Sequence, residues 1–161
     1  MVHRIAHLLL LTMLCVLAPC CTQYTRITDI ADLPLKQTSL PGMDWQLSPI
    51  RANARYVLYG TNSQKEREER LGDYYYVNWY DAQPSSHVRI VMSYTQALTA
   101  SRKLSCSVEY KEPRSHAGTR RDRFFFNGAE RARRGDILTW RIDLYVDGKL
   151  VDSRRSFLWQ D

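Results

Sequence analysis

Residues 137–159 read ILTWRIDLYVDGKLVDSRRSFLW, with Asp147-Gly148 near the middle. A two-residue Asp-Gly loop favours a type I′ turn, the turn that joins two antiparallel strands in a tight hairpin. The residue pairs that this turn predicts are Leu144 with Val151, Trp140 with Arg155, and Leu138 with Phe157. Most apolar residues then share one face of the hairpin, so we expect Trp140 and Phe157 to be buried.

Alternation with a period of two extends through the segments before the hairpin and is typical of half-buried strands. Residues 73–80 read DYYYVNWY and place Trp79 on the same face as Tyr75 and Val77. The other predicted strands are residues 55–59, 88–95, 103–110 and 123–127, with a first strand at 44–48 left open. Residues 61–71 predict the one clear helix, and residues 28–35 a single helical turn.

Seven or eight short strands without a long helix between them predict an all-β fold, an antiparallel β-sandwich, with a small β-barrel as the alternative. The strand count and the Trp-bearing central strand resemble an immunoglobulin-like or fibronectin type III sandwich. The Cys-Trp-Cys pattern of antibody domains is missing. The 161 residues, less a short leader, suit one domain.

The N-terminus has the layout of a secretion signal, because Arg4 precedes an apolar run at residues 8–17. This run is shorter than the roughly 20 residues that span a bilayer. The following Leu17-Ala18-Pro19-Cys20-Cys21 resembles the lipobox of bacterial lipoproteins, which implies a diacylated Cys20, or alternatively Cys21. Cleavage by the ordinary signal peptidase, with both thiols unmodified, is the other interpretation.

These features divide the chain into a signal peptide at 1–19, a tether at 20–51 that includes at most a first strand, and a sandwich domain at 52–161. The whole chain resembles the short envelope lipoproteins of Gram-negative bacteria, a class defined by location and not by activity. We therefore expect a protein of the cell envelope, on its periplasmic or outer-membrane face, attached to a membrane through an N-terminal lipid.

The positive charge of the chain is concentrated in one segment. Residues 111–134 hold eight Lys or Arg against three acidic residues, and the remainder of the mature chain is balanced. We expect two basic loops, 112–122 and 128–136, that flank one strand and form two patches if they leave it at opposite ends. An anionic glycan or an envelope protein is the expected partner, and no recognised motif for nucleic acid accompanies the charge. The candidate anion-binding residues are Arg114, Arg120, Arg121, Arg131, Arg133 and Arg134.

Residues for catalysis are sparse. His87 and His116 fall in predicted loops without an evident partner, and Cys106 alternates with polar residues as a buried strand cysteine does. No CxxC or HxxxH pattern predicts a metal site, and we expect no cofactor and no catalytic residue. The sequence favours a binding or scaffolding module. A small hydrolytic or carbohydrate-active domain is the alternative, if Asp73, Asp81 and Asp136 converge.

Overall fold

The computed structural model describes residues 23–36, 48–99 and 101–160. The predicted signal peptide and both candidate lipidation sites, Cys20 and Cys21, lie outside these residues. Among the helices within them, none is long and apolar enough to cross a bilayer.

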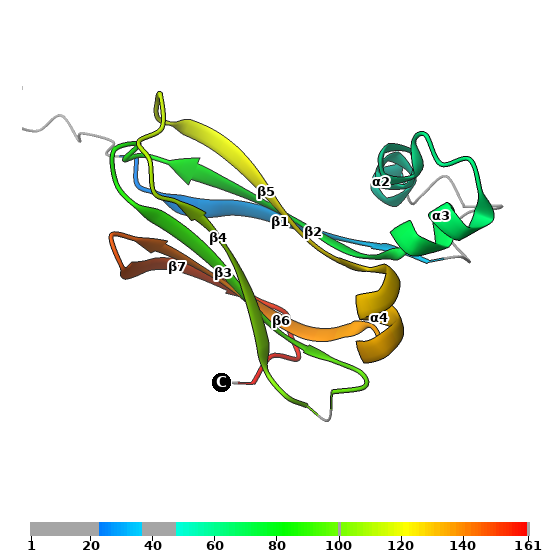
Figure 1. Cartoon of the computed structure of the whole chain (residues 1–161). Helices are drawn as coiled ribbons and strands as arrows, with labels where there is room; N and C mark the ends of the chain where they lie inside the picture. The colour runs from blue at the N-terminus through cyan, green and yellow to red at the C-terminus, as the bar shows by residue number, and fades with distance from the viewer. Residues whose placement is uncertain (1–22, 37–47, 100, 161) are drawn as a thin grey trace, which may run out of the picture.

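In the described part of the chain, seven strands form two antiparallel sheets that face each other (Figure 1). One sheet has the order β1-β2-β5 and the other β4-β3-β6-β7. This confirms the predicted β-sandwich; neither sheet closes into a barrel. The strands are β1 (Arg26–Leu35), β2 (Gly72–Asp81), β3 (Val88–Gln96), β4 (Leu104–Tyr110), β5 (Gly118–Asn127), β6 (Ile137–Val146) and β7 (Lys149–Arg155).

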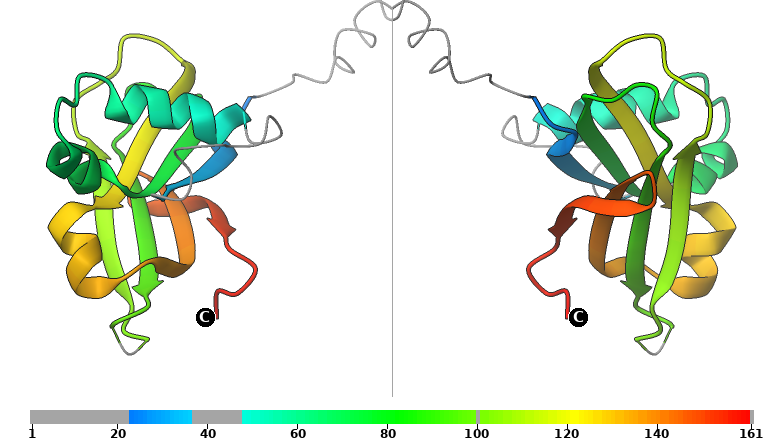
Figure 2. Two further views of the ribbon diagram at one scale, coloured as in Figure 1. Left: turned by 90° about the vertical axis from the view of Figure 1, so that its right-hand side faces the viewer. Right: turned by 90° about the vertical axis from the view of Figure 1, so that its left-hand side faces the viewer.

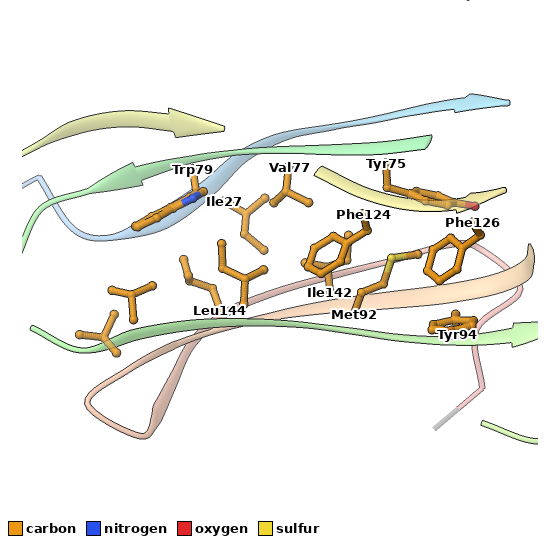
Figure 3. Packing of buried hydrophobic residues seen from close by; sticks show 13 residues of the cluster. Ile27, Tyr75, Val77, Trp79, Met92, Tyr94, Phe124, Phe126, Ile142 and Leu144 are labelled. Carbon is orange, nitrogen blue, oxygen red and sulfur yellow. The ribbon is translucent and has the colours of Figure 1, made fainter. Parts of the chain in front are cut away.

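The main core fills the space between the sheets (Figure 3). Trp79 on β2 is fully buried, as the alternation in DYYYVNWY predicts. β3 is a central strand that pairs with both β4 and β6, and its residues alternate strictly between buried and half-buried positions. The buried residues of this core are Ile27, Tyr75, Val77, Trp79, Val88, Ile90, Met92, Tyr94, Phe124, Phe126, Ile142, Leu144 and Val146.

The helices among the described residues are α2 (Ser48–Leu58), α3 (Gln64–Arg70) and α4 (Gly128–Arg134). Two further views show α2 on the outer side of the three-stranded sheet (Figure 2), and α3 contacts α2 and α4. A smaller core holds α2 there through Ala54 and Val57, which pack with Leu35 and Tyr74. The strand predicted at residues 55–59 is therefore wrong. Apolar residues three and four apart give α2 one buried face, and this packing overrides the strand propensity of its Tyr and Val.

The first strand lies where the sequence predicted a tether. β1 pairs along its length with β2, so the sandwich begins before residue 52, and the helical turn predicted at 28–35 is wrong. A register shift between Ile27 and Asp29 interrupts the alternation of β1, and Pro34 is tolerated because β1 is an edge strand. Of the strand left open at 44–48, residues 44–47 lie outside the described part and Ser48 begins α2.

The predicted hairpin forms, but its register differs. Asp147 and Gly148 have positive φ values of 48° and 77°, as a type I′ turn requires. A bulge then shifts the pairing, so that Leu144 faces Asp152 and not Val151. β7 ends at Arg155, and Phe157 lies in a turn beyond the strand. Phe157 is 100% exposed, which makes its predicted burial wrong, while Trp140 is half-buried at the margin of the core.

Candidate functional site

The structure separates the six candidate arginines into two groups. β5 carries Arg120 and Arg121 near its first residue, Gly118, and α4 follows its last residue, Asn127. Ten strand residues cover roughly 30 Å, so the groups lie at opposite ends of the sandwich and form no single patch. The second predicted loop is the helix α4, and the first ends within β5.

At the first end, Arg114 and Arg120 are structural. Both guanidinium groups donate to the fully buried carboxylate of Asp81, Arg120 at 2.8 Å, and the side chain of Arg114 is only 6% exposed. Burial raises the pKa of Asp81, but the hydrogen bonds from both arginines outweigh it and hold that pKa below its ordinary value. This cluster is a buried ion pair, and its cations are not available to a ligand.

At the other end, α4 neutralises most of its own charge. Arg131 donates to Asp136 at 2.6 Å and Arg134 to Glu130 at 3.0 Å. Arg133 donates to the backbone oxygen of Ala129 and remains exposed. Most of the basic charge that the sequence concentrates at 128–136 therefore meets a carboxylate of the same segment.

Arg121 belongs to a different surface, the outer face of the three-stranded sheet. Asp29, Asn78 and Arg121 are direct neighbours across β1, β2 and β5, and we call them the polar row. The Asn78 amide donates to Asp29 at 3.2 Å, and the Arg121 Nε donates to the Asn78 oxygen at 2.8 Å. The side chains of the row therefore hold one another in place.

A second row, Ala31, Tyr76 and Arg123, lies beside the polar row on the same face. The exposed guanidinium of Arg123 stacks on Phe125, 5.1 Å from the ring centroid. The two rows form the floor of an open groove of about 590 Å³. Volumes of this size are typical of sites for small ligands.

Helix α2 forms the wall of this groove through Asn53 and Tyr56. The Tyr76 hydroxyl donates to Oδ1 of Asn53 at 2.6 Å, which links the wall to the floor. Asn53 is only 6% exposed, yet its Nδ2 has no hydrogen-bond partner. A buried donor without a partner is destabilising by roughly 1–3 kcal/mol. Tyr56, one turn further along α2, is 68% exposed at the groove.

No protein family, no curated protein and no solved structure matches this chain.

One carboxylate of the groove forms hydrogen bonds with side chains of the core. Asp122 lines the groove, but its oxygens accept from the indole N–H of Trp79 and the hydroxyl of Tyr110, both at 2.7 Å. Among the groove residues, Asp29 is the other residue with a carboxylate. A glycosidase of the common kind uses a pair of carboxyl groups that flank the scissile bond, so the groove lacks that arrangement within the described residues.

Of the three carboxylates considered for a hydrolytic site, Asp73 and Asp136 lie near each other, and Asp81 does not join them. Asp73 and Asp81 lie at opposite ends of β2. Asp73 accepts from the backbone N–H of Ile137, next to Asp136, and ties the start of β2 to the start of β6. Burial raises the pKa of Asp73, while hydrogen bonds from Lys36 and Arg131 lower that of Asp136. Structural ion pairs produce such shifts as readily as catalytic ones.

The two histidines remain in loops. His116 Nδ1 lies 2.8 Å from the hydroxyl of its neighbour Ser115, and both side chains are exposed. His87, before β3, has a buried Nε2 without a hydrogen-bond partner. Within the described residues, no three His, Cys, Asp or Glu side chains gather as metal ligands would.

Sequence reasoning missed Arg123, Tyr76, Asn78 and the wall residue Asn53. The signal for the floor was present: Arg121, Arg123 and Phe125 alternate along β5, and Tyr76 and Asn78 along β2. Because β5 was predicted to begin only at residue 123, Arg121 was assigned to a loop and Arg123 to a structural strand. The wall could not be placed, since the residues of α2 had been assigned to a strand.

Proposed function

We propose that this protein is a lipid-anchored module of the cell envelope that binds a ligand, without catalysis, in the groove between α2 and the outer face of β1-β2-β5. The observation that carries the binding role is the groove itself. Two rows of polar, aromatic and cationic side chains form its floor, and Asn53 in its wall has an unpaired donor. The N-terminal signal and lipobox-like sequence support the envelope location.

Two features favour a binding module over the hydrolytic alternative. The space between the sheets is filled with apolar side chains (Figure 3), so the accessible chemistry lies on the outer faces. The groove residues supply hydrogen-bond donors, rings and cations, and beside Asp122, which is bonded to Trp79 and Tyr110, the carboxylate of Asp29. Such a set recognises a ligand but offers no pair of acid and base.

A variant that fills the groove tests this proposal. Ala31 lies on the groove floor, so Ala31→Trp places a large ring where a ligand would lie. Ala132→Trp on the exposed side of α4 is the matched control. The immobilised full-length protein is exposed to low-mass fractions of the native envelope, and retained compounds are identified by mass spectrometry.

We expect the wild-type protein and Ala132→Trp to retain a compound that Ala31→Trp does not retain. Equal retention by all three proteins would refute the groove as the binding site, and so would retention of no compound by the wild type. The melting temperatures of both variants establish that they are folded.

A further inference from the structure

We infer that the groove binds an acidic saccharide, a sugar that carries a carboxylate among neutral hydroxyl groups. This inference rests on the proposed function and names its class of ligand. Four features of the groove support it, and each corresponds to a different part of such a molecule.

The polar row matches the hydroxyl groups. Neighbouring strands are about 4.8 Å apart, so Asp29, Asn78 and Arg121 cover about 10 Å across the sheet. They present in order an acceptor, an amide that both donates and accepts, and a donor. A hydroxyl group donates and accepts as well, so a sugar with several adjacent hydroxyl groups can bind the donors and acceptors that the hydrogen bonds within the polar row leave free. A ligand with only anionic groups would be repelled by the Asp29 carboxylate.

The two arginines match the carboxylate. Arg121 and Arg123 stand two residues apart on β5 and so share the outer face, and both are exposed. Within the described part of the chain, neither forms a salt bridge, in contrast to Arg114, Arg120, Arg131 and Arg134. The planar guanidinium fork binds a carboxylate through two parallel hydrogen bonds.

Asn53 adds a donor that the protein itself does not use. Its Oδ1 is engaged by Tyr76, which orients the amide, while Nδ2 is buried without a partner. A ring or hydroxyl oxygen of the sugar would satisfy this donor after a side-chain adjustment of the kind common on binding. The gain would be the energy that the free protein loses by leaving Nδ2 unpaired.

Tyr56 matches the apolar face of a sugar ring. The side chain is 68% exposed although it lines the groove, so its ring has apolar surface to bury against a ligand. Sugars combine hydroxyl edges with C–H faces. The groove combines the polar row on the floor with this aromatic side chain on the wall.

The test begins with a glycan array that carries uronate, sialate, sulfated and neutral sugars. The array is probed with the full-length protein in detergent. The sugar that binds best is then compared with its carboxyl-reduced form by isothermal titration calorimetry. Variants Arg121→Gln and Arg123→Gln remove the two cations of the groove, and Asn53→Asp replaces the Nδ2 donor with an acceptor. Arg133→Gln removes the same charge from α4 and serves as the control.

We expect a carboxylated sugar to bind, and its Kd to rise at least tenfold after carboxyl reduction and in each groove variant, with Arg133→Gln unchanged. Equal binding of the carboxyl-reduced sugar overturns the inference, as does binding of sulfated sugars alone or of no sugar. A rise in Kd of the same size in Arg133→Gln also overturns the inference, since net charge would then explain the binding. In the retention experiment, the wild type could retain a compound that is not a saccharide and that Ala31→Trp does not retain. That result would overturn the inference of a saccharide ligand and would still support the proposed function.

Discussion

The carboxylate of Asp152 accepts a hydrogen bond of 2.8 Å from the backbone N–H of Ile27, and so joins the edge strand β7 of one sheet to the edge strand β1 of the other. The bulge in the β6-β7 pairing makes this contact possible, because it places Asp152 opposite the core residue Leu144.

Removal of this acceptor should separate the two edges. We expect Asp152→Ala to lower the free energy of unfolding by about 1–3 kcal/mol, because the Ile27 N–H would be left without its partner. Asp152→Asn keeps an acceptor oxygen and should lose less. Urea denaturation of both variants provides the measurement, and equal losses would show that the hydrogen bond is not what Asp152 contributes.

The register of β7 shows where sequence patterns reach their limit. The Asp-Gly turn was predicted correctly because its φ values follow from two adjacent residues. The bulge between Leu144 and Tyr145 brings Asp152 of β7 to Ile27 of β1, which lies more than a hundred residues earlier in the chain. Alternation alone also extends the strand to Phe157, which lies in a turn past the last residue of β7, Arg155.

The candidate site was misjudged for a related reason. Charge clustering along the sequence selected six arginines, but Asp81, Glu130 and Asp136 pair with four of them. The groove instead combines short pieces of β1, α2, β2 and β5 that are far apart in sequence. Period-two patterns predict which face a residue lies on. They do not predict which strands are neighbours.

Asp81 should make stability depend on pH. Asp81→Asn leaves the buried Arg114 without its counterion, and loss of one partner of a buried pair lowers the free energy of unfolding by about 3–5 kcal/mol. Since the folded-state pKa of Asp81 is depressed, its contribution is fully present above the ordinary value of about 3.9 and is lost as pH falls through the folded pKa.

Chemical denaturation from pH 7 to pH 2 would measure this dependence. The difference in the free energy of unfolding between the wild type and Asp81→Asn should be largest near neutral pH. It should become smaller in acid, once Asp81 is protonated. The exposed Glu112→Gln provides the control and should lie close to the wild type throughout. A difference in the free energy of unfolding that stays constant with pH would mean that the charge of Asp81 does not cause it.

Trp79 and Phe157 form a matched pair of aromatic residues with opposite environments. Trp79 is fully buried and Phe157 fully exposed. We expect Trp79→Ala to lower the free energy of unfolding by about 3–5 kcal/mol, as large truncations in packed cores do. Phe157→Ala should change it by less than about 0.5 kcal/mol. Urea denaturation of both variants shows whether Trp79 is buried and Phe157 exposed. A larger loss in Phe157→Ala than in Trp79→Ala would contradict the structure.

Cys106 should react slowly with thiol reagents. Burial raises the pKa of its thiol from 9.0 to about 11, so the reactive thiolate is scarce at neutral pH. In the chain from Thr22 onward, where Cys106 is the sole cysteine, labelling by iodoacetamide at pH 8 should be at least about a hundredfold slower than in urea. The folded-state rate should keep rising with pH up to about 11. A rate that levels off near pH 9 would show an ordinary, accessible thiol.

The lipid anchor can be tested apart from the groove, because its predicted cysteines precede the sandwich. If Cys20 or Cys21 is diacylated, the mature protein should sediment with membranes, since two acyl chains hold a protein stably where one chain holds it only marginally. The double variant Cys20→Ser/Cys21→Ser should appear in the soluble fraction. One single variant should behave like the double variant and the other like the wild type, which identifies the modified residue. Mass spectrometry of the N-terminal peptide from the native host provides the direct measurement. An unmodified N-terminus would remove the lipoprotein interpretation, and ordinary signal-peptidase cleavage with two unmodified thiols would then account for the same sequence.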